Sequence, residues 1–312
     1  MFLTLLAACG GPQPDVPAGR YSAVGAVDAD TLYMAGGATN AGKSAEVWAW
    51  TPDAGWSRRG DAPAPIFRAT AVPLGDAVWV FGGSGDGNVD LDTLYRWTPA
   101  DDAWEEVTPD GAGPTPRYKH GAIAWNEQML VVGGKNDDAD PTVISDDAWA
   151  YDPASNTWQA YPGPGAIYRE GMTVDEDGTL WLHGGIDADE VRHDWLWTWD
   201  GAAWTQQPDG DPRPDVRASH SFEALDGALW LWGGHGTDTD VWRLDPATQT
   251  WQDLPTDVAP AARDAQVTLV DDGLLYVLGG DSSSTDLPDF LNDVWSYDPG
   301  AGVWTEWEGW TE

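Results

Sequence analysis

Apolar residues along this chain form short runs that are rich in β-branched and aromatic side chains, and Gly, Pro, Asp and Asn separate these runs. No window keeps the 3.6-residue spacing of an amphipathic helix, so the pattern predicts an all-β chain. The clearest runs end in a pair of glycines, and six of them occur, at residues 31–37, 77–83, 129–134, 180–185, 229–234 and 275–280. Each run is typical of one buried strand that stops where the glycines let the backbone turn.

The glycine pairs are the most regular part of an internal repeat. Successive pairs are 46, 51, 51, 49 and 46 residues apart, a period that is typical of propeller blades. An arginine opens the apolar stretch before each pair, namely Arg20, Arg68, Arg117, Arg169, Arg217 and Arg263. An aromatic turn follows each pair and ends at a tryptophan, namely Trp56, Trp104, Trp158, Trp204, Trp251 and Trp304. We therefore predict six units of four strands each.

These features together resemble the kelch repeat, in which the arginine opens the first strand, the glycine pair ends the second, the aromatic turn ends the third and the tryptophan begins the fourth. The resemblance covers residues 20–307. It implies an all-β fold, a six-bladed β-propeller of four-stranded antiparallel blades over residues 19–312, with tryptophans filling the gaps of about 10 Å between blades. Trp307 and Trp310 are less regular and are free either to contact a ligand or to seal the joint between the last and first blades.

The first nine residues, MFLTLLAAC, are apolar and end in small residues before the only cysteine of the chain. This segment resembles the lipobox of bacterial lipoproteins, which implies cleavage before Cys9, a lipid on its sulfur and a flexible spacer to residue 18. The basic start of a signal peptide is missing, and the alternative is an ordinary apolar N-terminus. We expect an extracytoplasmic protein, anchored at the outer membrane or cell surface. A single cysteine also excludes an intrachain disulfide.

The charge of the chain is strongly one-sided, with 15 Lys and Arg against 52 Asp and Glu and a formal net charge of −37. Such a surface repels nucleic-acid phosphates and anionic lipid headgroups, so a nucleic-acid partner is excluded. Hydrophobic residues make up 42% of the sequence, which supplies a full core, so the acidity does not indicate disorder.

The kelch resemblance places the loops between second and third strands on one face of the propeller, and here these loops are long and acidic. We expect a protein or glycan partner to bind on this face, with Asp137, Asp138 and Asp286 of the loops and the six repeat arginines as its contacts. The arginines are 6 of only 15 basic residues. Either each guanidinium ties blades together by pairing with carboxylates or carbonyls, or part of the ring recognises a carboxylate-bearing peptide or sugar.

Another candidate on this face is a calcium site. Asp86, Asn88, Asp90 and Asp92 alternate as oxygen ligands do in a calcium loop. The Gly and the acidic residue that complete an EF-hand loop are replaced by Leu91 and Trp97, and the alternative is a solvated acidic loop.

Two classes of propeller enzyme need residues that this sequence lacks. Galactose-oxidase-like propellers need a cysteine crosslinked to a tyrosine, and the only cysteine here lies in the lipobox. Nitrile-specifier-like kelch proteins need a histidine where Thr198 stands. The remaining alternative is a periplasmic sugar mutarotase, a class that includes six-bladed kelch proteins acting on sialic acid; proton transfer there needs a carboxylate facing the channel, such as Glu170 or Glu223. No spacing singles these out, so we expect a binding scaffold without assigned catalytic residues.

Overall fold

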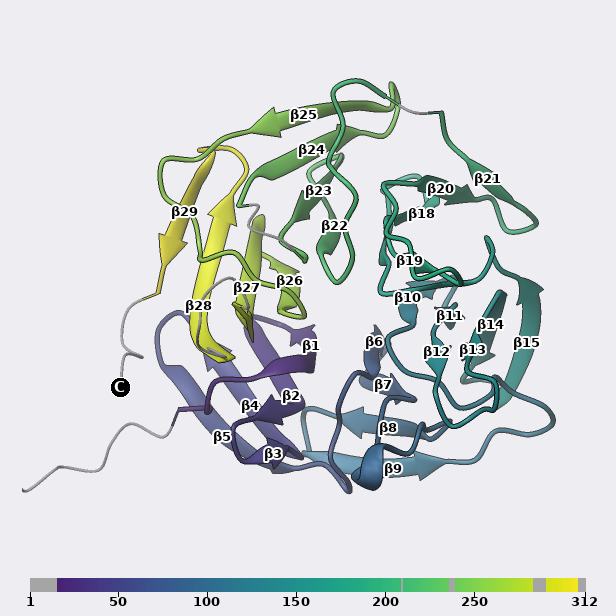
Figure 1. Ribbon diagram of the computed structural model, residues 1–312. Helices are drawn as coiled ribbons and strands as arrows, with labels where there is room; N and C mark the ends of the chain where they lie inside the picture. The colour runs from purple at the N-terminus through teal and green to yellow at the C-terminus, as the bar shows by residue number, and fades with distance from the viewer. Residues whose placement is uncertain (1–15, 209, 236–238, 283–289, 308–312) are drawn as a thin grey trace, which may run out of the picture.

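The computed structural model describes residues 16–208, 210–235, 239–282 and 290–307. These residues form six antiparallel sheets, each built around four main strands, that stand around a common axis (Figure 1). The predicted six-bladed β-propeller is therefore confirmed. The first strand of each blade lies nearest the axis and the fourth lies at the rim (Figure 1).

The strands follow one another through each blade in chain order. Blades 1 and 2 consist of β1 (Tyr21–Asp28), β2 (Thr31–Thr39), β4 (Glu46–Thr51) and β5 (Gly55–Asp61), then β6 (Thr70–Leu74), β7 (Ala77–Phe81), β8 (Leu94–Thr98) and β9 (Ala103–Val107). Blades 3 and 4 consist of β10 (Gly121–Trp125), β11 (Gln128–Val132), β14 (Asp147–Asp152) and β15 (Thr157–Pro162), then β17 (Gly171–Val174), β18 (Leu180–His183), β20 (Leu196–Trp199) and β21 (Trp204–Gln206). Blades 5 and 6 consist of β22 (Ser221–Leu225), β23 (Ala228–Trp232), β24 (Val241–Asp245) and β25 (Thr250–Leu254), then β26 (Val267–Asp271), β27 (Leu274–Asp281), β28 (Phe290–Asp298) and β29 (Val303–Glu306).

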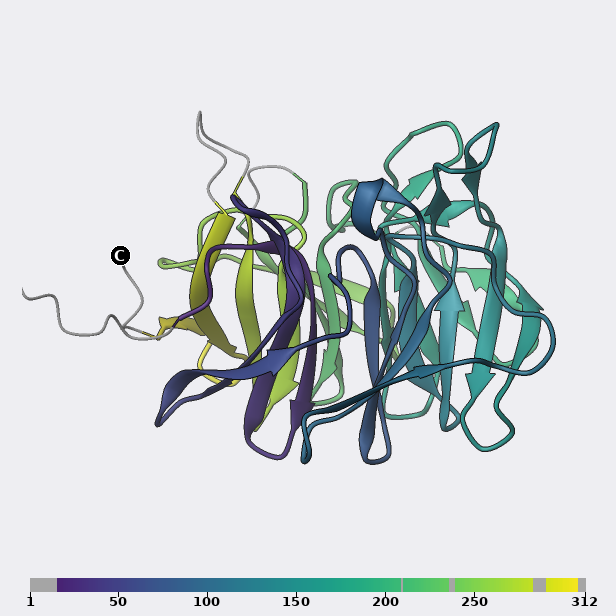
Figure 2. The same cartoon turned by 90° about the horizontal axis from the view of Figure 1, so that it is seen from below.

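Short elements decorate one face of the propeller. They are β3 (Gly42–Lys43), the 3₁₀ turn η1 (Asp86–Asn88), the pair β12 (Lys135–Asn136) and β13 (Val143–Ile144), and the pair β16 (Ile167–Tyr168) and β19 (Ile186–Asp187). In the side view, η1 and the loops between second and third strands project from the same side (Figure 2). No helix in the described part of the chain is long and apolar enough to cross a membrane.

Burial explains why second strands are the most apolar. All five residues of β7 are buried, whereas most residues of β9, at the rim of the same blade, are exposed. A second strand has neighbouring blades on both of its faces, so it keeps no polar side. This is why the runs before the glycine pairs read as continuous hydrophobic segments rather than as alternating ones.

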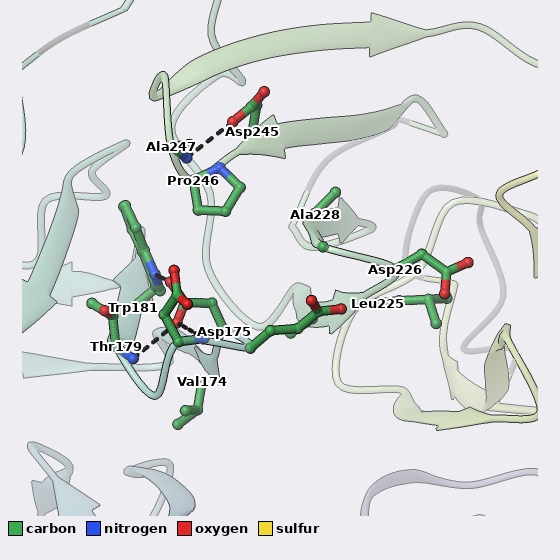
Figure 3. Close-up of a pocket in the computed structure, with 14 residues that line it drawn as sticks. Val174, Asp175, Thr179, Trp181, Leu225, Asp226, Ala228, Asp245, Pro246 and Ala247 are labelled. Carbon is green, nitrogen blue, oxygen red and sulfur yellow. Dashed lines mark hydrogen bonds between the residues drawn. The ribbon is translucent and has the colours of Figure 1, made fainter.

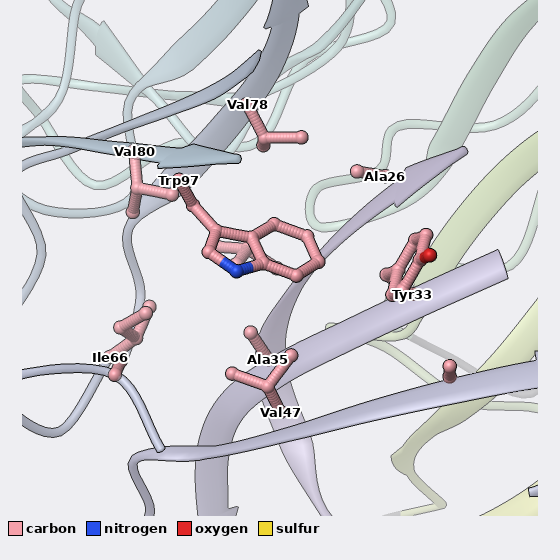
Figure 4. Packing of buried hydrophobic residues seen from close by; sticks show 11 residues of the cluster. Ala26, Tyr33, Ala35, Val47, Ile66, Val78, Val80 and Trp97 are labelled. Carbon is pink, nitrogen blue, oxygen red and sulfur yellow. The ribbon is translucent and has the colours of Figure 1, made fainter. Parts of the chain in front are cut away.

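The joint between blades 1 and 2 shows how the tryptophans act. Trp97 of β8 points into the gap between Val78 and Val80 of its own blade and Ala35 of blade 1 (Figure 4). Its ring meets that of Tyr33 edge to face, with centroids 5.0 Å apart. Aromatic side chains are needed here because adjacent sheets stand too far apart for small residues to meet.

The ring closes without exchanging a strand between the blades at the chain ends. β1 to β5 form blade 1 and β26 to β29 form blade 6, and the main-chain N–H of Arg20 donates to the carbonyl of Leu291 across the joint (3.0 Å). The indole of Trp307 packs edge to face on Trp50 of blade 1, with centroids 5.3 Å apart, while its N–H donates to Ser296 of blade 6 (3.1 Å). Trp307 therefore seals this joint, one of the two roles its position suggested.

The glycine pairs also link neighbouring blades. Both glycines of each pair have positive φ, and the second donates its N–H to a carbonyl at the start of the next blade. Gly133 shows the spatial constraint, because a Cβ added there would stand 2.3 Å from the carbonyl oxygen of Ile167. Gly87 in η1 has a similar φ of +69°, yet a Cβ there would meet nothing within 4 Å.

We expect Gly133→Ala to destabilise the fold by at least about 2 kcal/mol more than Gly87→Ala. Both changes carry the cost of a left-handed backbone, which is on the order of 1 kcal/mol, and only Gly133→Ala adds a clash with the backbone of the next blade. Urea unfolding followed by tryptophan fluorescence measures the difference. Equal losses of stability in the two variants would contradict close backbone packing at the pairs.

Candidate functional site

A closed circle of backbone hydrogen bonds surrounds one mouth of the central channel. Six residues contribute, one at or just before the start of the first strand of each blade, and each donates its N–H to the carbonyl of its counterpart in the preceding blade at 2.8 to 3.2 Å. We call this circle the mouth ring, and its members are Ser22, Arg68, Lys119, Arg169, Ser219 and Ala265. All six have φ between +52° and +62°. The ring lies on the same face as the acidic loops, since the first strand of every blade starts there.

The mouth ring corrects the alignment of the repeat arginines. We expected all six at one position, but only four share it, and Arg68 and Arg169 lie two residues further on, in the ring itself. Ile66 and Ile167 take the first position in blades 2 and 4, because their carbonyls accept the N–H of the preceding blade's second glycine just as the carbonyls of the four arginines do. The arginine motif was correct in four blades and shifted by two residues in the other two.

The four arginines at the first position are held inside the blades, and we call them the clamp arginines. Each is buried and donates to the carbonyl of the first glycine of its own blade, through Arg20, Arg117, Arg217 and Arg263. Arg117 is typical: it contacts the Gly133 carbonyl at 2.9 Å and the Asp147 carboxylate at 2.7 Å. This pairing holds the pKa of Asp147 below its usual range despite burial. These guanidinium groups stabilise blades 1, 3, 5 and 6, and none of them lines the channel cavities.

The mouth ring gathers three cations from adjacent blades. Arg68, Lys119 and Arg169 line one cavity of about 190 Å³ together with the other ring members. Burial and the neighbouring guanidinium groups of Arg169 and Arg68 lower the pKa of Lys119 to about 7. Burial likewise lowers the pKa of Arg169. Three like charges in so small a space favour an anionic ligand, since it would relieve their repulsion.

The contacts of the two ring arginines leave donors unused. Arg68 lies over the ring of Phe67, 4.6 Å from its centroid, and Arg169 donates to Ser219 at 3.2 Å. The Nε atoms of both arginines are buried and have no hydrogen-bond partner within the described residues. The carboxylate of Asp264 lies 3.8 Å from the guanidinium group of Arg169 in the mouth ring. The same carboxylate also pairs with His235.

Behind the mouth the channel continues into a second chamber of about 200 Å³. His120, Glu170, His220 and Gln266 line both chambers, and Glu223 lines the inner one. Glu170 accepts the N–H of Gly121 at 2.7 Å through Oε1, while its Oε2 is buried without a partner among the described residues. Burial raises the pKa of Glu170 to about 7 and that of Glu223 to about 8.

Burial has the opposite effect on the channel histidines, since it disfavours the charged form of each group. It lowers the pKa of His120 to about 3 and that of His220 well below its usual value. Both imidazoles are therefore neutral near pH 7. The inner chamber combines neutral hydrogen-bonding groups with two carboxyl groups that can exchange protons near neutral pH.

The acidic loops around the mouth contact one another. Asp90 is buried, and its carboxylate accepts the backbone N–H groups of Asp137 (2.6 Å) and Asp138 (3.3 Å). Asp138 in turn accepts the N–H of Asp90 at 2.7 Å. Asp137 also accepts a hydrogen bond from Tyr118 and lies 3.6 Å from Lys135. These bonds dock the loops of blades 2 and 3 on each other.

The same contacts bear on the calcium prediction. Asp86, Asn88 and Asp92 are exposed on the loop that carries η1, whereas the Asp90 carboxylate is directed at the blade 3 loop. Within the described ranges no group of three or more His, Cys, Asp or Glu is arranged to hold a metal ion. Calcium binding at this loop stays a prediction.

A larger hollow of about 550 Å³ lies on the opposite face, between blades 4 and 5 (Figure 3). The β17–β18 and β22–β23 hairpins and the turn after β24 form it. Its Asp175 accepts the N–H of Thr179 and the indole N–H of Trp181, and Asp245 accepts the N–H of Ala247. These carboxylates hold turns, and the lining contains no basic residue, so this hollow does not favour the anions that the mouth attracts.

Some sequence-based candidates lie outside the described residues, namely Cys9, Asp286 and Trp310. The lipid anchor and the Asp286 contact stay predictions. Conversely, the sequence reasoning missed Lys119, which belongs to the ring. The signal was present, because Lys119 follows Arg117 by the same two residues that separate Ser219 from Arg217.

Six four-stranded blades around a polar channel define this protein as a β-propeller of the kelch type. The family model of the KLHDC2/KLHL20/DRC7 Kelch-repeats domain matches residues 9–168 and again residues 160–310, and the chain belongs to this kelch-repeat family. The predicted kelch resemblance is thereby confirmed. Kelch propellers are typically scaffolds that bind other proteins.

Two curated relatives agree with this assignment, and a solved structure shares the fold. The chain is 25% identical over 262 residues to Kelch domain-containing protein 3 of Bos taurus, covering 76% of this chain and 67% of that protein. It is 25% identical over 261 residues to a leucine-zipper-like transcriptional regulator 1 homolog of Drosophila melanogaster, of which it spans only 26%. The structure of YjhT superimposes with a TM-score of 0.77 at 17% identity, over 94% of this chain and 99% of that one, which shows a shared fold.

The division between clamp and ring arginines predicts losses of stability that differ in size. Arg117→Met should cost about 2–4 kcal/mol, because it leaves the Gly133 carbonyl and the Asp147 carboxylate without their buried donor. Arg68→Met should change stability by less than about 1 kcal/mol, because it loses cation–π contacts but also relieves repulsion at the mouth. Chemical denaturation of both variants measures this. A larger loss for Arg68→Met would contradict the assignment.

Proposed function

We propose that this chain is an extracytoplasmic kelch scaffold that binds a protein or glycan partner by accepting a carboxylate of the partner at the channel mouth. The observation that carries the proposal is the convergence of Arg68, Lys119 and Arg169 on one cavity in a chain of net charge −37. The extracytoplasmic, lipid-anchored setting is supported by the lipobox-like sequence before Cys9.

A carboxylate that approaches the mouth meets the permanent charges of Arg68 and Arg169, which line one cavity, and it can accept hydrogen bonds from both guanidinium groups. Charge-assisted hydrogen bonds of this kind are stronger in a partly buried cavity than at an open surface. The ring backbone is fixed by its own hydrogen bonds, so little order has to be gained on binding.

The proposal gives different roles to the residues predicted as partner contacts. Arg68 and Arg169 bind the carboxylate, with Lys119 added to them. The exposed side chains of Asp137 and Asp138 stand at the rim and contact the body of the partner. The clamp arginines are buried within the blades, and the proposal gives them no contact with the partner.

We expect glucuronate, a sugar acid, to bind the wild-type protein and glucose, its uncharged counterpart, not to bind. An acetylated tetra-alanine peptide with a free C-terminus should likewise bind better than the same peptide amidated. Arg68→Met or Arg169→Met should weaken glucuronate binding by about 10- to 100-fold, the effect of losing one charge-assisted hydrogen bond. Isothermal titration calorimetry at low salt measures these affinities.

Arg96→Gln is the matched control, because Arg96 pairs with Asp76 at the opposite end of blade 2 (3.1 Å) and its loss changes the net charge equally. It should leave the affinity unchanged. Weakening by Arg96→Gln as large as that by Arg68→Met would show only a general charge effect. Equal binding of glucose and glucuronate would overturn the proposal.

A sugar mutarotase is the second candidate function, and the inner chamber is the observation that favours it. Glu170 and Glu223 line the space directly behind the mouth, where the ring of a sugar acid held by its carboxylate would lie. Near pH 7.5 Glu170 is largely ionised and Glu223 largely protonated, given pKa values of about 7 and about 8. One carboxylate base and one carboxylic acid are what opening and closing of a hemiacetal ring require.

If the chain is a mutarotase, it should accelerate anomer exchange of N-acetylneuraminate, with a rate that peaks between about pH 7 and 8. The rate falls below this window as Glu170 is protonated and above it as Glu223 ionises. Glu170→Gln should reduce the rate by about 100-fold while Arg96→Gln should not change it. Exchange no faster than in buffer, measured by NMR, would exclude this candidate and leave the binding scaffold.

A further inference from the structure

Lys119 differs from its neighbours in the mouth ring because it is the only ring cation that can lose its proton near neutral pH. It lies between Arg68 and Arg169, and backbone hydrogen bonds of 2.9 Å on each side fix this order. Arginine stays charged in proteins, so the two flanking charges are permanent. Among the described residues, Arg169 pairs with Asp264 and Lys135 pairs with Glu190, whereas Lys119 forms no ion pair.

The other groups around Lys119 also shape its protonation. Lys135 of β12 adds a third neighbouring cation, and Asp264, before β26, is a carboxylate that favours the charged form of Lys119. The Tyr118 ring lies 5.3 Å from its Nζ. His120, Glu170, His220 and Gln266 line the same cavity from the first strands, and His235 holds Asp264 from the blade 5 loop.

We propose that the mouth takes up a proton whenever it binds a carboxylate, and that Lys119 is the group that receives it. The inference rests on the proposed carboxylate site and adds its regulation by pH. In the empty site, burial and the positive neighbours hold Lys119 partly neutral. A bound carboxylate supplies the missing counter-charge, so the bound state contains the ammonium form.

The proposed proton uptake makes the affinity for a carboxylate depend on pH. The pKa of Lys119 is about 7 in the empty protein and rises in the complex, so the complex binds more protons. Affinity is therefore highest below pH 7 and falls as pH rises through and above 7. A partner would be held in an acidic medium and released in an alkaline one.

The proton uptake by Glu170 must be distinguished from that by Lys119, because both residues line the cavity. The pKa of Glu170 is also about 7, and a bound anion would raise it further, which gives proton uptake of the same sign. Lys119→Arg keeps the positive charge but cannot titrate. Glu170→Gln removes the carboxyl group and leaves Lys119 in place. The two variants therefore divide the proton uptake between these groups.

The test is calorimetric titration of the full chain with glucuronate at pH 8, in buffers of different ionisation enthalpy. The dependence of the observed heat on the buffer gives the number of protons taken up. We expect the wild type to take up more protons than Lys119→Arg, by close to one for each glucuronate bound, because Lys119 is mostly neutral in the empty site at this pH. Glu170→Gln should keep most of the wild-type uptake. Between pH 7 and 8 wild-type affinity should fall several-fold more than that of Lys119→Arg.

The possible results distinguish the role of Lys119, the role of Glu170 and the carboxylate site itself. Equal proton uptake by the wild type and Lys119→Arg would overturn the role of Lys119 and leave the carboxylate site intact. Uptake that disappears in Glu170→Gln would assign the proton to the carboxyl group instead. No binding of glucuronate by the wild type from pH 6 to 8 would overturn the proposed function itself. Far-ultraviolet circular dichroism and a melting curve verify that each variant is folded.

Discussion

The mouth ring is the interaction on which the rest of this structure depends. Six backbone hydrogen bonds run from blade to blade and return to the first blade, so they close the propeller although no strand is exchanged between its ends. Only main-chain atoms form them, which leaves the six side chains free to vary. The glycine pairs add a second set of backbone links just outside the ring. Closure and the proposed carboxylate recognition thereby use different atoms of Arg68, Lys119 and Arg169.

This separation explains how an acidic protein can present a cationic site. The net charge of −37 is distributed over exposed loops and turns, where water and salt screen it within about 8 Å. Arg68, Lys119 and Arg169 lie in a partly buried cavity, where their charges are screened less. In the proposed complex an anionic partner meets a repulsive outer surface and a short-range attractive mouth, an arrangement that favours specificity over general adhesion of anions.

The number of blades and the four strands of each could be predicted from the sequence, because the same strand pattern occurs six times. The site was predicted only in part. An arginine near the start of a first strand lies inside the blade or at the channel mouth, depending on a shift of two residues. In blades 2 and 4 the first position is taken by Ile66 and Ile167, so the sequence pattern did not indicate that their arginines lie two residues later. Glu170 and Glu223 could be nominated but not justified, because their burial arises only when six separate segments converge on the axis. No local pattern records such convergence.

The measurement that tests carboxylate recognition at the mouth most directly is a crystal structure of the chain grown with glucuronate. We expect density for the sugar acid at the channel mouth, with its carboxylate within hydrogen-bond distance of Arg68, Lys119 and Arg169. Density in the hollow between blades 4 and 5, or a carboxylate turned away from the mouth ring, would instead place recognition elsewhere on the propeller.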